Sequence, residues 1–440
     1  MKFLALDSRW IAQTRGVRLS LGSVTKEDRN PLFVADKPWE MRFDNLYPNV
    51  RFDENELFKV WYSPFVLDEA VAHTLPERRR EVRYHATPGR EMGVCYATSR
   101  DGIHWGKPEL GLVEFEGSTR NNLVKRQAHG AGIGKDLHDP DPARRYKMLS
   151  LIDESTNLEG VAFSPDGLHW SDPVPCPEIQ ARGDTHHSFF WDQGLGRYIG
   201  FTRTWESPHR IVARTESEDF LQWSQTVEVM RALPDAPHLQ PYSLVAFPHA
   251  PGYLGLVMIF NAHEDTVDCE LAWSADAVKW ERICPGETLI PRGPEGTFDC
   301  GCLFGAAHPI RKNNELWLYY GGSDGPHSNW RRGGFGLARL REDGFAGMEP
   351  VRKDGIGTLA TRPIVCGGRD LRVTADAAGG TLRVGILGAE GYGLDECLPI
   401  RGDVTRARVT WRGVGLASLG DRPLQLQFEL RSAKLYAIEI

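Results

Sequence analysis

The sequence lacks several features that would place it in a familiar functional class. Its formal net charge of −7 argues against nucleic acid as a partner. No stretch approaches the roughly 18 apolar residues of a membrane span, and the N-terminal apolar run is too short for a signal peptide. The eight cysteines form no Cys-x-x-Cys pair or zinc-type cluster, which predicts reduced thiols. We expect a cytoplasmic protein without metal, cofactor, nucleic acid or membrane partner.

Helical periodicity is also scarce, since no 3.6-residue stripe runs beyond two turns. Instead, a phrase recurs five times, clearest as Ala-Thr-Ser-Arg-Asp-Gly-Ile-His-Trp at 97–105 and Ala-Phe-Ser-Pro-Asp-Gly-Leu-His-Trp at 162–170. Its closing aromatic residues, spaced 53 to 65 residues apart, are Trp105, Trp170, Trp223, Trp280 and Phe345. Such a period is typical of repeated units that cannot bury a hydrophobic face alone. The Asp-Gly turn and the Trp favour a structural role for the phrase itself.

Two further elements precede each phrase and have strand character. One is rich in aromatic and branched residues, and the earlier one aligns 45–53 with 184–192, 240–248 and 299–307. Four strands in each of five units predict an all-β fold, a five-bladed β-propeller over residues 31–362. Residues 363–440 indicate a small C-terminal β-sandwich with a hairpin at Gly379-Gly380, and residues 1–30 could pair with it.

The first unit is longer than the others by about 20 residues, and long insertions in compact repeats are commonly functional. The surplus lies between Pro64 and Arg90 and is polar and charged. We expect this insertion to overhang the channel mouth or to contact a second copy of the chain in a homo-oligomer.

Acidic residues stand at the starts of the predicted inner strands, where the side chains of a propeller converge on one channel. In the second unit, Asp136 has His129 and Asp139 as rivals. Turn-forming Asp is common at strand starts, so a structural role is the alternative for each. Together they suit glycoside hydrolysis, in which one acid protonates the leaving oxygen and a carboxylate attacks or activates water. The candidate catalytic residues are Asp44, Asp184, Asp299 and Asp136.

Polar and aromatic residues near these carboxylates are the candidate substrate contacts. On a strand, Asp184 and His186 point to the same side, which favours hydrogen bonding to a polar substrate over a metal site. His263 and Glu264 follow the second strand of the fourth unit and could reach the rim. The candidate substrate-binding residues are Asn45, His129, His186, Tyr242, His263 and Glu264.

The repeated phrase, the five units and the C-terminal sandwich resemble the glycoside hydrolase clan of invertases, fructanases and arabinanases. The stretch 96–124, with Lys-Pro-Glu-Leu-Gly at 107–111, is similar to bacterial proteins labelled family 32-like. The resemblance implies an Asp nucleophile or base, matched by Asp44 in Phe-Asp-Asn, and a stabilising Asp, matched in part by Asp136. It also implies a Glu acid in the third blade, where this chain has Asp184 and no Glu-Cys pair.

We therefore expect a glycoside hydrolase or transglycosidase that acts on a small glycoside or glycan end, with a furanoside as one candidate substrate. Two alternatives stay open. A non-catalytic carbohydrate-binding propeller would need aromatic platforms without perturbed carboxylates. A sialidase-like hydrolase is the other, because the phrase resembles an Asp-box that is one residue short.

Overall fold

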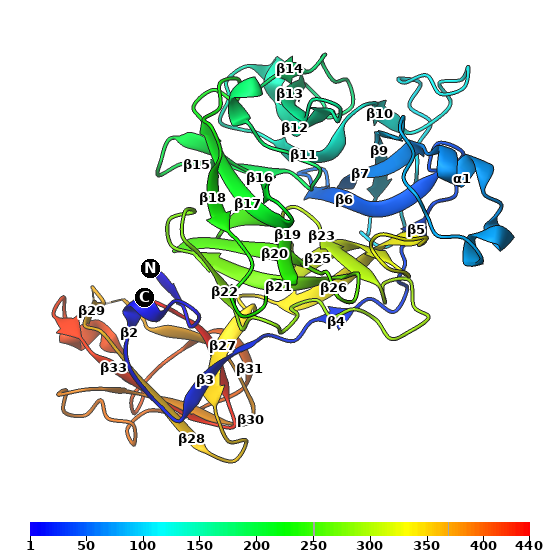
Figure 1. Ribbon diagram of the computed structural model, residues 1–440. Helices are drawn as coiled ribbons and strands as arrows, with labels where there is room; N and C mark the ends of the chain where they lie inside the picture. Colours follow the sequence, from blue (N-terminus) through cyan, green and yellow to red (C-terminus); the bar gives the residue numbers. More distant parts are fainter. Residues whose placement is uncertain (250, 368) are drawn as a thin grey trace.

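The computed structural model describes residues 1–249, 251–367 and 369–440, and it is nearly all β, as the sequence predicts. In Figure 1, antiparallel sheets coloured from blue to yellow lie above a group of yellow-to-red strands that the N-terminal strands join. The helices are single turns or little more, such as α1 (Glu69–His73). Within the described ranges, no helix is long and apolar enough to cross a membrane.

The upper part contains five antiparallel units that follow one another along the chain. Each of the first four units begins with its lowest-numbered strand, called here its first strand. The first unit consists of β6 (Arg42–Phe52), β7 (Phe58–Leu67), β9 (Val94–Ser99) and β10 (Leu123–Lys125), with β8 (Glu91–Met92) beside β7. The second consists of β11 (His129–Lys135), β12 (Tyr146–Asp153), β13 (Leu158–Ser164) and β14 (Val174–Pro175), and the third of β15 (Ser188–Asp192), β16 (Arg197–Glu206), β17 (His209–Ser217) and β18 (Val227–Met230). The fourth consists of β19 (Leu239–His249), β20 (Gly252–Asn261), β21 (Thr266–Ser274) and β22 (Trp280–Ile283).

The fifth unit borrows its edge from the N-terminus. It consists of β23 (Cys302–Gly305), β24 (Ile310–Lys312), β25 (Glu315–Ser323) and β26 (Gly333–Arg341), and β26 pairs with β4 (Thr25–Lys26) and β5 (Phe33–Val34). A single parallel pairing, Val267 with Cys302, joins it to the fourth unit.

The first strands of the five units contact one another in sequence. β6 contacts β11, β11 contacts β15, and β15 contacts β19; β23 lies against both β20 and β6. Side chains bridge the neighbours: Asn49 on β6 bonds to Ala131 O and Ile133 N on β11 at 2.7 and 2.9 Å. Likewise Ser188 Oγ on β15 donates to Leu244 O on β19 at 2.8 Å. The starts of these strands therefore come close together in space.

The repeated phrase has the structural role that the sequence favours. At 99–105, Asp101 Oδ1 accepts hydrogen bonds from the backbone N–H groups of Ile103 and His104 at 2.9 and 2.8 Å. Ser99 Oγ accepts one from Gly102 N at 2.8 Å. The indole of Trp61 in turn donates to Gly167 O of the next phrase, so that turn also links the first and second units.

The insertion of the first unit folds back over the loop before β26. After α1 and a 3-10 turn (Pro76–Arg80), Tyr84 N donates to Asn329 Oδ1 at 2.9 Å. Trp330 Nε1 donates to Val82 O at 2.9 Å, and the Arg79 guanidinium lies 4.9 Å from the Trp330 ring. The insertion therefore packs against a loop that is far away in the sequence.

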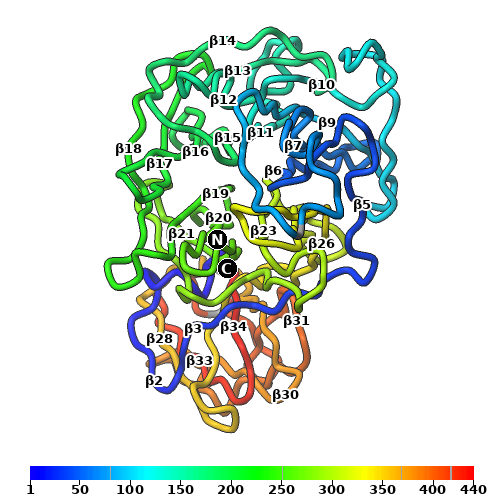
Figure 2. Tube along the Cα trace, turned by 45° about the vertical axis from the view of Figure 1, so that its right-hand side comes forward, coloured from blue at the N-terminus to red at the C-terminus, as the bar shows by residue number. Residues whose placement is uncertain are grey.

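Nine strands form the remaining sheet, and both termini belong to it. Figure 2 shows the two ends of the chain close together. The strands are β1 (Lys2–Leu4), β2 (Ile11–Arg15), β3 (Val17–Leu21), β27 (Ala346–Pro350), β28 (Ile356–Thr361), β30 (Arg372–Ile386), β31 (Ile400–Arg408), β33 (Leu426–Arg431) and β34 (Lys434–Glu439). A separate pair is β29 (Ile364–Val365) with β32 (Pro423–Leu424).

Two details of this sheet differ from the sequence prediction. The hairpin predicted at Gly379-Gly380 is wrong, because β30 is continuous through both glycines and pairs first with β34 and then with β33. The glycines suit this crossing because a Cβ at Gly380 would lie 1.9 Å from Arg431 O. In addition, β27 and β28 join this sheet, although they lie before the predicted boundary at residue 362.

Candidate active site

A cavity of about 370 Å³ lies where the starts of several inner strands meet. The insertion contributes residues 83–86 and 90 to its wall, and the loop before β26 contributes His327 and Ser328. Five of the residues predicted from the sequence line this one cavity: Asp44, Asn45, His129, Asp184 and Tyr242. The structure therefore brings together candidates from four successive units.

A break in the pairing of β6 aims its side chains into the cavity. Leu46 and Tyr47 both have positive φ, 60° and 42°, and the register with β7 shifts on either side of Leu46. Such backbone in residues other than glycine costs about 1–3 kcal/mol each and concentrates at functional sites. As a result, Asp44 and Asn45 both line the cavity, whereas regular alternation would send neighbours to opposite faces.

Two arginines hold Asp44 as a carboxylate. Its Oδ1 accepts a hydrogen bond from Arg331 Nε at 2.5 Å and also contacts Arg331 Nη2, while Arg42 Nη2 lies 3.3 Å away. Burial would raise the pKa of Asp44, but the charges of Arg331 and Arg42 outweigh it and hold the pKa well below its usual range. Asp44 can therefore act as a nucleophile or base at neutral pH.

His129 lies between two carboxylates. Its Nε2 is 2.9 Å from Asp184 Oδ1, and its Nδ1 is 2.6 Å from Glu154 Oε1. Burial would lower the pKa of His129, but Asp184 and Glu154 raise it to about 9. Burial would raise the pKa of Asp184, but Arg203, at 3.2 Å from Oδ2, and His129 hold it well below its usual range. At neutral pH, His129 is an imidazolium and Asp184 is an anion.

Hydroxyl groups form another part of the wall. Asn45 Nδ2 donates to the hydroxyls of Tyr47 and Tyr242 at 2.6 and 3.3 Å, and those two hydroxyls are 3.3 Å apart. Burial raises the pKa of Tyr47 well above its usual value, so the phenol stays protonated. These groups give the cavity donors and acceptors for the hydroxyls of a polar ligand.

His186 lies behind this wall rather than in the cavity. It is buried, its ring is centred 5.3 Å from that of Tyr47, and its Nε2 lies 3.5 Å from Asn49 Oδ1. Burial, with the neighbouring His187 and His308, lowers its pKa to about 3. His186 therefore supports Tyr47 as a neutral ring.

Asp299 has partners away from the cavity. Its Oδ2 lies 2.5 Å from Lys26 Nζ and accepts a hydrogen bond from Tyr320 Oη at 2.8 Å. Lys26 belongs to β4, the N-terminal strand that closes the fifth unit. Strand register alone could not predict that the N-terminal strand β4 pairs with the fifth unit and brings Lys26 to Asp299. Asp299 therefore forms an ion pair and does not line the cavity.

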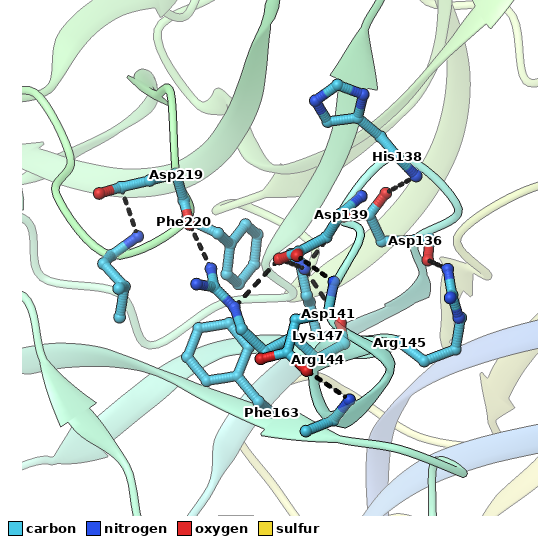
Figure 3. Close-up of polar contacts among 12 residues, drawn as sticks. Asp136, His138, Asp139, Asp141, Arg144, Arg145, Lys147, Phe163, Asp219 and Phe220 are labelled. Atoms are coloured by element: carbon cyan, nitrogen blue, oxygen red, sulfur yellow. Dashed lines mark hydrogen bonds and ion pairs between the residues drawn. The ribbon is translucent and has the colours of Figure 1, made fainter.

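Asp136 also lies elsewhere, in a buried network of ion pairs (Figure 3). Lys147 Nζ, fully buried, is 3.0 Å from Asp136 Oδ2 and 2.8 Å from Asp139 Oδ2. Tyr198 Oη donates to Asp136 at 2.5 Å. Asp136 follows the end of β11, whose first residue, His129, lines the cavity. Seven residues of strand separate the two by roughly 20 Å, so His129 is the residue that the second unit brings to the cavity.

The predicted rim residues also fall outside the cavity wall. The ring of His263 stacks on that of His238 at 4.2 Å, and Glu264 lies 3.8 Å from Arg292. Within the described residues, no group of three or more His, Cys, Asp or Glu side chains could hold a metal ion.

Sequence reasoning missed the arginines. Arg42 could have been found, because it stands two residues before Asp44 on one strand and so shares its face. Arg331 gives no such signal, since a loop brings it from the far end of the fifth unit to Asp44. Glu154 also gives no signal in the sequence, because it lies in the turn after β12 and contacts His129 only in the folded chain.

No protein-family model and no curated protein matches the chain. Among solved structures, it is similar to an N-acetylgalactosamine deacetylase from F. plautii in complex with blood group B trisaccharide, with 15% identity, 74% of this chain and 96% of that chain covered, and a TM-score of 0.49. It is similar to a β-1,2-mannobiose phosphorylase from Listeria innocua at 13% identity, with 72% and 96% covered and a TM-score of 0.49. A glycosyl hydrolase from Bacteroides ovatus matches at 15% identity, with 72% and 94% covered and a TM-score of 0.47. Likeness at this level carries no conclusion about activity.

Proposed function

We propose that this chain is a glycoside-acting enzyme, a hydrolase or transglycosidase, whose reaction takes place between Asp44 and Asp184. The observation that carries the proposal is that two carboxylates from different units line one cavity, together with a protonated imidazole and two phenol hydroxyls. Glycosyl transfer needs this set: an anion to attack the anomeric carbon or activate water, and an acid for the leaving oxygen.

We also propose that the five units are the blades of a five-bladed β-propeller, the architecture of the invertase clan that the sequence resembles. The contacts between successive first strands support this proposal. In a propeller, those strands surround a central channel, and the cavity at their starts is the usual place for a ligand.

In this proposal the roles follow the charges. Asp44, ionised by Arg331 and Arg42, attacks the anomeric carbon or takes a proton from the attacking water. His129 rather than Asp184 holds the transferable proton, which moves to the leaving oxygen as the glycosidic bond breaks, directly or by way of Asp184. This assignment replaces the resemblance-based expectation that Asp184 is the resting acid.

A panel of aryl furanosides and pyranosides tests the proposal. The wild type should cleave at least one of them, and Asp44→Asn should lower turnover by roughly 10³-fold while sugar binding survives. Glu109→Gln is the matched control, because Glu109 is an exposed carboxylate that pairs with Arg120 and does not line the cavity. Full activity of Asp44→Asn would refute the assignment, and sugar binding without cleavage of any glycoside would favour the binding-module alternative.

The acid role has its own test. His129→Gln should slow cleavage of alkyl glycosides by roughly 10² to 10⁴-fold, the range for a general acid. Aryl glycosides with activated leaving groups should lose much less, because their leaving oxygen needs no proton. Equal losses on both kinds of substrate would contradict a proton-donating role for His129.

A further inference from the structure

The cavity carries more positive charge than its carboxylates balance, in a chain with a net charge of −7. Asp44 is already paired with Arg331, and Asp184 with Arg203 and His129. The insertion adds two more arginines, Arg83 and Arg90, to the cavity wall. Among the described residues, neither of these forms an ion pair with a carboxylate, whereas Arg42 and Arg331 pair with Asp44, and His129 and Arg203 pair with Asp184.

Arg42 and Arg90 each lie over an aromatic ring that lines the cavity. The Arg42 guanidinium lies 3.7 Å from the centre of the Tyr84 ring, and the Arg90 guanidinium lies 4.8 Å from that of the Phe65 ring. Burial would lower the pKa of Arg90, but the neighbouring Tyr84 raises it. The Arg42 side chain is only 5% exposed, and within the described part of the chain its Nε and Nη1 have no hydrogen-bond partner. A buried donor of this kind costs about 1–3 kcal/mol while it stays unpaired.

A second pair of arginines also supports an excess of positive charge around the cavity. Arg203 and Arg210 lie 4.6 and 5.3 Å from the ring centre of Tyr242, which lines the cavity. Only Arg203 has a carboxylate partner among the described residues, and the Nε atoms of both lack hydrogen-bond partners there. Burial and the neighbouring Arg203 charge lower the pKa of Arg210. An additional anion near Tyr242 would relieve this repulsion.

We infer that the sugar bound in this cavity carries an oxyanion group, a carboxylate or a phosphate, and that Arg42 and Arg90 receive it. The inference rests on the proposed function and names its substrate class. Planar guanidinium groups match the oxygens of carboxylates and phosphates, and such hydrogen bonds are stronger than those between neutral groups. An acidic sugar would balance the charge of Arg90, and a small shift of the buried Arg42 side chain would let the same anion satisfy its unpaired donors.

Calorimetric titration with matched sugars tests the inference. The probes are methyl glycosides of glucuronate and galacturonate, those of glucose and galactose as neutral counterparts, glucose 6-phosphate, and inorganic phosphate. At least one acidic sugar should bind the wild type roughly tenfold or more tightly than its neutral counterpart. That preference should vanish in Arg90→Gln, and it should weaken at 1 M salt, which screens the approach of an anion but screens a pair inside the cavity much less. Arg120→Gln, at an exposed arginine paired with Glu109, should keep it.

Three outcomes would overturn the inference: neutral sugars that bind as tightly as acidic ones, a preference that persists in Arg90→Gln, or no binding by any acidic probe. Tight binding of inorganic phosphate, equal to that of the sugar phosphate, would overturn the claim that the sugar carries the anion. Cleavage assays separate this inference from the proposed function. Acidic sugars that bind but are never cleaved would refute only the proposed enzymatic function. Cleavage of neutral glycosides without a preference for acidic ones would refute only the inference that the substrate carries an anion.

Discussion

The protonation of His129 is the sharpest quantitative consequence of the site. The histidine pKa rises from 6.5 to about 9 in the folded chain because Asp184 and Glu154 hold the imidazolium. A pKa that is higher by one corresponds to about 1.36 kcal/mol, so this rise contributes about 3 kcal/mol to stability. Because the folded pKa is the higher one, the contribution is complete below pH 6.5 and is lost as pH rises through 9. The His129 ring is only 6% exposed, but the side chains of Asp184 and Glu154 are 57% and 43% exposed, so solvent screening makes about 3 kcal/mol an upper value.

Two assays measure this effect. Histidine-selective NMR should show one ring that titrates near pH 9, and its signal should be missing from His129→Gln. Denaturant unfolding should show a stability gap between wild type and His129→Gln that shrinks by up to about 3 kcal/mol from about pH 6 to about pH 10. The control is His104→Gln, at an exposed ring on the first repeated turn. A His129 that titrates at or below pH 6.5, or a stability gap independent of pH, would refute the reasoning.

The remaining predictions concern one contact of His129, the ion pairs of Lys147, and Asp299. Glu154→Gln should lower the pKa of His129 and move the alkaline limb of kcat/KM to lower pH, which a pH profile would show; an unmoved limb would contradict the contact. Lys147→Met should cost about 3 kcal/mol or more in urea unfolding, because it leaves the buried carboxylate of Asp136 without its cation, whereas Asp139 keeps Arg144 at 3.0 Å; a neutral result would mean that the Lys147 ion pairs add nothing. Asp299→Asn should leave turnover within about threefold of wild type once folding is verified, since its partners lie outside the cavity; a collapse of kcat alone would return Asp299 to the site.

The repeat was readable from the sequence because its physical causes are local. An Asp-Gly turn and a closing Trp recur along the chain, and alternating aromatic residues indicate the strands before it. That Asp44, Asp184 and His129 line one cavity could be predicted for the same reason, since each stands at or near the start of a first strand.

The features that sequence reasoning missed depend on contacts between distant segments. Lys26 reaches Asp299 across the fifth unit, and Arg331 reaches Asp44, in both cases through segments whose course only the folded chain reveals. The positive φ that follows Asn45 on β6 is also invisible to a rule of strict alternation. The continuous β30 shows the same limit, because a Gly-Gly pair serves a close crossing as readily as a turn.

A crystal structure of Asp44→Asn with an uncleaved glycoside bound tests the central claim most directly. The proposal predicts the sugar in the 370 Å³ cavity, with its anomeric carbon facing the side chain at position 44. The glycosidic oxygen should lie about 3 Å from His129 Nε2 or an Asp184 oxygen, the distance for proton transfer. A sugar bound elsewhere on the molecule, or one whose scissile bond points away from both groups, would contradict it.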